Sequence, residues 1–370
     1  MNKKISMQDL EDSQIDSSIE KLKQKDEILE EKRARITSGE NSVESKSKYW
    51  SVFNFVFLGI ISSMIGWAVA EQLTRPDTPN RPFSNLFNSN INFSSGLFFV
   101  IVGFFIFFFI VYWDTLVYSF NKDSFIAILK TLPLIIVILT IASIINNGVF
   151  SFLSINVRES GQSLEYEEIY GALTLVRSGS WAIWGALAGM IIGLFPTYNK
   201  KSLSNGAIGG FTGGAVGGYG FNSITTAVRA NFENTVEVSG TLPGALGRFF
   251  AIIFFGFAVG IAIGSVKALR TKYWIEILSG GMAGKQFLFE SDEITIGSLY
   301  TNDITLIKDP KIPEYACRIE TQDSSPSLVN DKSYDFLEVN NTKVENIQNL
   351  EDGSIITVGD TVLKFYEGSN

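Results

Sequence analysis

The chain has 370 residues, of which 46% are hydrophobic and 18% charged, and its formal net charge is −8. This charge gives no support for nucleic-acid binding, which requires a clustered basic surface. The single cysteine, Cys317, excludes a disulfide within the chain and a metal site built on cysteines, and the absence of histidine removes the commonest metal ligand and general base. We therefore expect no enzyme, no metal and no other cofactor.

The first segment, residues 1–47, is polar and strongly charged, and no apolar stretch follows its early lysines, so we do not interpret it as a signal peptide. We predict a cytoplasmic arm that is partly helical or disordered, because Ile15, Ile19, Leu22 and Leu29 follow a three-four spacing. Two alternatives stay open: the helix pairs with a copy of itself, or it is solvated on all sides.

Six apolar segments predict a membrane domain over residues 48–270. The longest begins at Leu97 and carries no charge before Asp114, and about 20 apolar residues suffice to cross the hydrocarbon core. A buried helix of a soluble protein would need a polar face, which this segment lacks. The six predicted spans are residues 51–70, 97–117, 125–145, 178–195, 205–226 and 249–266.

Lysines in the short loops predict how these spans are oriented. If six spans alternate, Lys46, Lys48, Lys122, Lys200 and Lys267 lie on one side, whereas the other side carries scattered arginines and no lysine. Positively charged loops remain in the cytoplasm. We therefore expect both termini in the cytoplasm and an integral protein of a bacterial-type plasma membrane.

Glycines recur at every fourth residue in the last three predicted spans. This spacing places them on one helix face, where a missing side chain lets another backbone come close. The predicted packing residues are Gly185, Gly189, Gly193, Gly206, Gly210, Gly214, Gly218, Gly209, Gly213, Gly217, Gly256, Gly260 and Gly264. We interpret them as contacts inside the domain or as a seam in a homo-oligomer. A pore is less favoured, because four of the six predicted spans contain no charge, and Asp114 and Lys130 lie toward the ends of the other two.

Residues 273–370 have a different pattern, with short alternating stretches that are separated by Gly, Asn, Asp and Pro. Many short strands of this kind predict an all-β sandwich. The predicted fold is thus a membrane all-α six-helix bundle with glycine-ladder packing, followed by a C-terminal all-β sandwich.

Several motifs in the predicted sandwich occur in a recognisable order: Ile296-Gly297, Asn302-Asp303-Ile304-Thr305-Leu306, Val339-Asn340-Asn341-Thr342 and Leu350-Glu351-Asp352-Gly353. In this order and spacing, residues 273–367 resemble the forkhead-associated (FHA) domain. The resemblance implies an eleven-stranded sandwich whose loops at one end bind phosphothreonine peptides.

The sequence departs from the FHA family where that family grips phosphate. Ser298 stands at the position of the family's arginine, and Pro313, Glu314, Tyr315 and Ala316 stand at its Ser-Arg-x-His run. An anion needs cationic or N–H donors, and Glu314 would repel it. The resemblance therefore implies peptide binding with weak or no dependence on phosphothreonine. The residues that it implies are Ser298, Thr301, Asn302, Asn340, Asn341 and Thr342.

These predictions together indicate a membrane-anchored adaptor or scaffold that presents an FHA-like domain to a cytoplasmic protein. Its expected partners are the lipid bilayer and that protein, with no nucleic acid. The alternative is a channel or transporter subunit with a regulatory FHA-like domain.

The predicted orientation can be tested with an impermeant maleimide applied to intact cells. We expect a cysteine introduced at Ser163 to react, because the loop after the third span lies outside. A cysteine at Ser42 should react only after the cells are lysed. The reverse pattern would contradict the topology.

Overall fold

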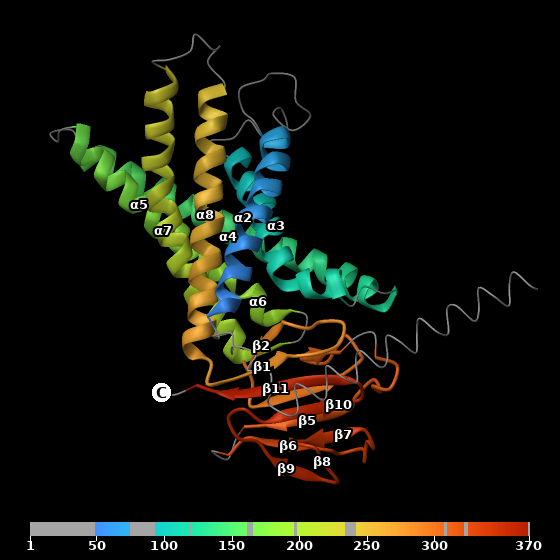
Figure 1. The fold of residues 1–370 in the computed structure, drawn as a ribbon. Helices are drawn as coiled ribbons and strands as arrows, with labels where there is room; N and C mark the ends of the chain where they lie inside the picture. Colours follow the sequence, from blue (N-terminus) through green and yellow to red (C-terminus); the bar gives the residue numbers. More distant parts are fainter. Residues whose placement is uncertain are drawn as a thin grey trace, which may run out of the picture.

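The structure is a computed structural model that describes residues 49–74, 93–118, 120, 122–160, 166–195, 198–233, 242–306, 309–321 and 325–368. The arm predicted for residues 1–47 lies outside the described residues. A helical part leads directly into an all-β part, and the helices stand above the strands in Figure 1. The helices are α2 (Trp50–Thr74), α3 (Phe93–Tyr118), α4 (Lys122–Ser160), α5 (Tyr166–Gly189), α6 (Ile191–Leu194), α7 (Lys200–Glu233) and α8 (Leu242–Arg270).

Five segments among the described residues are long and apolar enough to cross a membrane: Trp50–Thr74, Gly96–Val117, Lys122–Val157, Glu168–Leu194 and Ala245–Arg270. By the criteria of length and composition, the predicted number of six spans is therefore one too many. The predicted span 205–226 forms most of α7, but its many glycines leave it less apolar than its neighbours. Even so, α7 makes its most extensive contacts with α5 and α8, so it belongs to the same bundle.

Helices α2 and α8 run antiparallel, which brings both ends of the helical part together. Val52, near the start of α2, lies against Gly264, near the end of α8. Further along both helices, Gly59 lies against Gly256. The start of the first described helix and the entry to the all-β part therefore lie at the same end of the bundle.

Contacts between helix backbones dominate the packing of α5, α7, α8 and α2. A Cβ added at Gly189 would overlap the carbonyl of Gly206, and one added at Gly185 would overlap that of Gly210. A Cβ added at each of the other ladder glycines would also come close to a residue of a neighbouring helix. The pairs are Gly193 with Leu203, Gly209 with Ile263, Gly213 with Val259, Gly214 with Trp181, Gly217 with Phe255, Gly218 with Ser178, Gly256 with Gly59, Gly260 with Phe55, and Gly264 with Val52. Larger residues at these positions would force the helices apart.

The C-terminal part is the predicted all-β sandwich. Its strands are β1 (Tyr273–Ile277), β2 (Gln286–Leu288), β3 (Glu293–Gly297), β4 (Ile304–Thr305), β5 (Cys317–Glu320), β6 (Ser327–Val329), β7 (Leu337–Val339), β8 (Thr342–Lys343), β9 (Ile347–Asn349), β10 (Ile355–Val358) and β11 (Thr361–Glu367). One sheet has the order β2-β1-β11-β10-β7-β8 and the other β4-β3-β5-β6-β9. Ile275, Ile296, Ile319 and Phe365 are buried between the sheets, as the alternating pattern predicts.

The edge strands are β2 and β8 in one sheet and β4 and β9 in the other. Strand β2 lies nearest the helices in Figure 1, whereas β8 and β9 lie farthest from them. The helical part thus covers one side of the sandwich and leaves the opposite side open.

A leucine at Gly213 should destabilise the bundle. A Cβ at this position would lie 2.5 Å from the Cα of Val259 on α8, so neither helix can yield without a backbone shift. Overpacking of this kind costs about 1–3 kcal/mol or more. The matched control is Gly179→Leu on α5, where nothing lies within 4 Å of an added Cβ. In detergent, we expect the thermal midpoint to fall for Gly213→Leu only, and equal midpoints would contradict the packing.

Candidate functional site

The loops of the sandwich separate the predicted peptide-binding residues into two groups. Ser298, Thr301 and Asn302 lie in the loop between β3 and β4. Asn340 and Asn341 connect β7 to β8, and the N–H of Asn340 donates to the carbonyl of Ile355 at the start of β10. The pairing of β7 with β10 and of β3 with β5 places these groups at opposite ends of the sandwich. The structure therefore does not bring them together.

Asn302 holds the β3–β4 loop against the segment that leads into β5. Its side-chain amide donates to the carbonyl oxygens of Leu299 at 2.9 Å and Glu314 at 2.7 Å. The backbone N–H of Ser298 donates to the carbonyl of Pro313 at 2.9 Å. Asn302 thus uses its amide N–H groups within the loops, and Ser298 lies beside the Pro313 carbonyl.

Asn340 and Asn341 form a tight turn. Their φ values are +49° and +64°, which two-residue hairpin turns require and asparagine tolerates. The side-chain oxygen of Asn340 accepts a hydrogen bond from the N–H of Ile355 at 2.9 Å. This geometry accounts for both asparagines as turn residues, and Thr342 follows them as the exposed first residue of β8.

The loop between β6 and β7, residues 330–336, lies at the same end as Ser298 and is missing from the sequence prediction. Buried Asn330 organises this loop by donating to the carbonyls of Tyr334 and Val344. The Tyr334 hydroxyl donates to the carbonyl of Lys311 at 3.0 Å, and burial raises the pKa of this hydroxyl to about 12. The polar residues that follow the apolar strand β6 could have indicated this loop from the sequence, but the resemblance to the FHA family indicates Asn340 instead.

Two cations of this domain, Arg318 and Lys343, already bind carboxylates. Arg318 pairs with Glu320 at 2.7 Å and also with Asp331. The hydrogen bond to Glu320 raises the pKa of the Arg318 guanidinium further. Lys343 pairs with Asp335 at 2.8 Å. A phosphate that bound Arg318 or Lys343 would have to displace one of these carboxylates.

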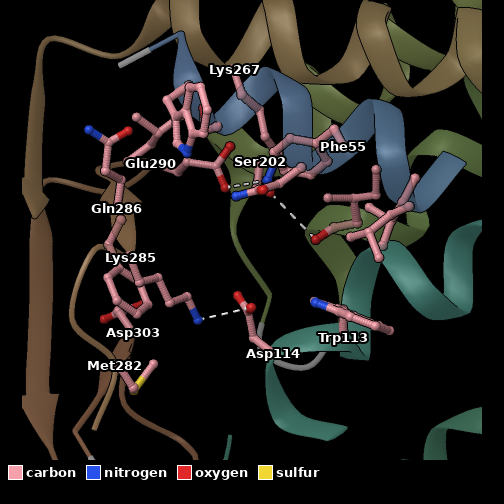
Figure 2. Close-up of a pocket in the computed structure, with 18 of the residues that line it drawn as sticks. Phe55, Trp113, Asp114, Ser202, Lys267, Met282, Lys285, Gln286, Glu290 and Asp303 are labelled. Atoms are coloured by element: carbon pink, nitrogen blue, oxygen red, sulfur yellow. Dashed lines mark hydrogen bonds and ion pairs between the residues drawn. The ribbon is translucent and has the colours of Figure 1, made fainter. Parts of the chain in front are cut away.

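A second polar site lies where the helices meet the sandwich, a region that we call the junction. Figure 2 shows Lys285, which precedes β2, reaching toward Asp114 near the end of α3. The two side chains form an ion pair at 2.9 Å. Lys267 of α8 forms another with Glu290, also at 2.9 Å. Two ion pairs from different helices therefore hold the β2 side of the sandwich.

The junction encloses a cavity of ≈ 620 Å³. Its lining includes Phe55, Trp113, Ser202, Met282, Gln286 and Asp303, which come from both parts of the chain (Figure 2). The four charged side chains of the two ion pairs also line it. The polar lining of this cavity thus serves largely to join the two parts.

Burial and charge act differently on the two ionisable side chains that the sandwich contributes. Burial lowers the pKa of the Lys285 amine, and the charge of Asp114 offsets this only in part. Burial would raise the pKa of the Glu290 carboxyl, but the Lys267 charge and hydrogen bonds, among them one from Asn205 at 3.3 Å, hold that pKa below its usual value. Glu290 therefore stays ionised and anchors the junction.

Residues 276–369, a quarter of the chain, match a family model described as the cytoplasmic domain of an inner membrane component of the type III secretion system. The sheet order and this match agree with the motifs in the sequence. We call the C-terminal domain FHA-like after the motifs that it shares with that family. No curated protein matches the chain.

Solved structures that are similar to the FHA-like domain include three with a TM-score of 0.25, each covering 27% of this chain. One comes from a study of phosphothreonine-dependent FHA domain interactions, with 19% identity over 100% of its length. Another is the FHA domain of CT664 from Chlamydia trachomatis, with 20% identity over 100% of its length. The third is the cytoplasmic domain of the type III secretion sorting platform protein PscD from P. aeruginosa, with 15% identity over 82% of its length.

Replacing Glu290 with Gln should loosen the junction. The variant leaves Lys267, which is only 11% exposed, without its carboxylate, and breaking a buried pair costs about 3–5 kcal/mol. We expect faster hydrogen exchange of the β2 amides in Glu290→Gln but not in the control Glu293→Gln, whose side chain is 58% exposed. Because the Glu290 pKa is lowered, the stabilisation is complete above the unfolded pKa of about 4.3 and is lost as pH falls through the folded value. Equal exchange in the two variants would contradict the anchoring role.

Proposed function

We propose that the protein is a membrane-anchored scaffold that presents its FHA-like domain to a protein partner in the cytoplasm. The observation that carries this proposal is the junction, where Lys267–Glu290 and Lys285–Asp114 fix the domain to the helices. A domain held by several helices keeps one orientation to the membrane, which suits the assembly of a partner at a defined position. The matching family, an inner membrane component with a cytoplasmic domain, supports the same arrangement.

Two features support a cytoplasmic position for both termini. The start of α2 and the end of α8 lie at the end of the bundle that carries the FHA-like domain. Lys200, Lys267 and Arg270 lie at that same end, as positively charged cytoplasmic loops would. We propose a homo-oligomer only as an alternative, in which the glycine faces would contact a second copy of the chain. Within one chain, the ladder glycines already contact neighbouring helices.

We further propose that partner binding does not depend on phosphothreonine. Ser298 and Pro313 stand where the FHA family has phosphate-binding side chains. Arg318 and Lys343 are paired with carboxylates. Glu314 is exposed beside the same loop and would repel an anion.

Ionisable side chains inside the helices favour an anchor over a transport path. Arg248 of α8 binds both oxygens of Glu71 at 2.6 and 3.0 Å. These two residues lie just outside the ends of the predicted spans 51–70 and 249–266. Glu71 lies about 32 Å along α2 from Trp50, which is a full bilayer core away from the junction. Transport sites lie near mid-depth, whereas this pair joins two helices at their far end.

The proposal predicts a soluble partner whose binding requires the FHA-like domain and persists after phosphate groups are removed. The full chain and a chain ending at Thr271 would each be cross-linked in membranes, purified and compared before and after phosphatase treatment. We expect a cytoplasmic protein with the full chain only, in equal amounts after the treatment. If the domain instead bound phosphothreonine, the amount of partner recovered would fall at least about tenfold after the treatment, because a charge-assisted hydrogen bond contributes about 1.5–3 kcal/mol. Loss of the partner on treatment contradicts phosphate independence, and ion flux in proteoliposomes without any partner would favour the channel alternative.

A further inference from the structure

Within the described part of the chain, the open side of the sandwich ends in a strand that has only one neighbour. Strand β9 pairs with β6 on one side and is the last strand of its sheet. All three of its residues are exposed, and the Ile347 side chain is 65% exposed. Natural proteins usually protect such an edge with charges, proline or a covering segment. None of the three residues of β9 is charged or proline.

The hydrogen bonds around β9 define which backbone groups face outward. The N–H of Asn330 donates to the carbonyl of Asn346, and the N–H of Leu350 donates to that of Pro326. Inward and outward groups alternate along an antiparallel strand. The N–H and C=O groups of Ile347 and Asn349 therefore point away from β6, in position to pair with another strand.

Strand β9 is held in this conformation by its flanks. Val344 and Leu350, on either side of the strand, are buried in the core of the FHA-like domain. The edge is thus preorganised, so an incoming strand would not have to order it first.

The charges near β9 indicate the chemistry of the partner. Glu345 precedes the strand, and Glu351 and Asp352 follow it, all three exposed. Asp335 is also exposed nearby and is paired with Lys343. The flanks of β9 are therefore acidic while its centre carries an exposed isoleucine.

A second copy of this chain fits the edge poorly. Antiparallel pairing of two β9 strands around Gln348 would set Glu345 of one copy opposite Glu351 of the other. Like charges directly opposite each other destabilise a strand pair. A segment with apolar residues between basic ends would pair with the same surface favourably.

We propose that β9 is the partner-binding edge of the FHA-like domain and that it takes an extended, basic-flanked segment of a cytoplasmic protein as an added strand. This inference rests on the proposed scaffold function and names the surface that performs it. The main-chain groups of Ile347 and Asn349 supply affinity, the Ile347 side chain packs against an apolar residue opposite, and the acidic flanks select basic ends. The helices lie next to β2, and β9 lies on the side of the sandwich away from them (Figure 1).

The test uses the full chain in nanodiscs and a synthetic peptide in which Val and Thr alternate between two Lys at each end. We expect this peptide to bind and to slow hydrogen exchange at Ile347 and Asn349. A peptide with Glu in place of Lys should bind at least about tenfold more weakly. Ile347→Lys should weaken binding of the Lys peptide by a similar factor, because it removes the apolar contact and adds a repelling charge.

The matched control is Leu299→Lys, an exposed apolar residue in the β3–β4 loop at the Ser298 end of the sandwich. We expect it to bind the Lys peptide as the unmodified chain does. Absence of binding, equal binding by Ile347→Lys, or protection that appears at β2 or the β3–β4 loop would overturn the inference. If any of these occurs while a soluble partner still co-purifies with the full chain, the scaffold function stands and only the edge assignment fails.

Discussion

The ion pair between Lys267 and Glu290 determines how the two halves of this protein relate. Lys267 lies in the last turn of α8, only a few residues before β1, so a flexible connection would otherwise let the sandwich turn freely. The carboxyl group of Glu290 is buried against Lys267 and Asn205, and it is stable there only because its charge is compensated. This contact, together with Lys285–Asp114, sets the β2 side of the sandwich against the membrane helices and leaves the β8–β9 side exposed.

The junction depends in turn on how closely the helices pack. Lys267 and Asn205 come from α8 and α7, whose backbones meet at Gly209 and Gly213. Gly189 and Gly206 bring α5 and α7 equally close, and Gly59 and Gly256 do the same for α2 and α8. In a bilayer the hydrophobic effect cannot drive such association, so van der Waals contact between glycine faces is what remains. The glycines therefore build the platform on which the FHA-like domain is mounted.

Contacts within the FHA-like domain occupy many polar groups of its loops. Asn302 ties the β3–β4 loop to the segment before β5, and Asn330 organises the neighbouring loop from a buried position. The carboxylates of Asp331 and Asp335 pair with Arg318 and Lys343. A recognition surface on the exposed β9 edge uses the part of the domain that the membrane helices leave open, and it needs no phosphate.

The sequence by itself determined the elements of this protein. An uninterrupted Phe- and Ile-rich run is typical of a membrane span, alternating residues such as those of β5 bury one face of the strand, and glycines at every fourth position lie on one side of a helix. The sequence predicted the helix of α7 but counted it as a sixth apolar span, although its glycines leave it less apolar than its neighbours. The family motif alone could not show that Asn340 forms a hairpin turn at the end opposite Ser298. Only the tertiary structure decided which side of the sandwich faces the helices. Glu290 meets Lys267, Lys285 meets Asp114 and Glu71 meets Arg248, and two of these three pairs join residues more than 150 positions apart. Such contacts follow from the docking of whole surfaces, which no local pattern of residues encodes.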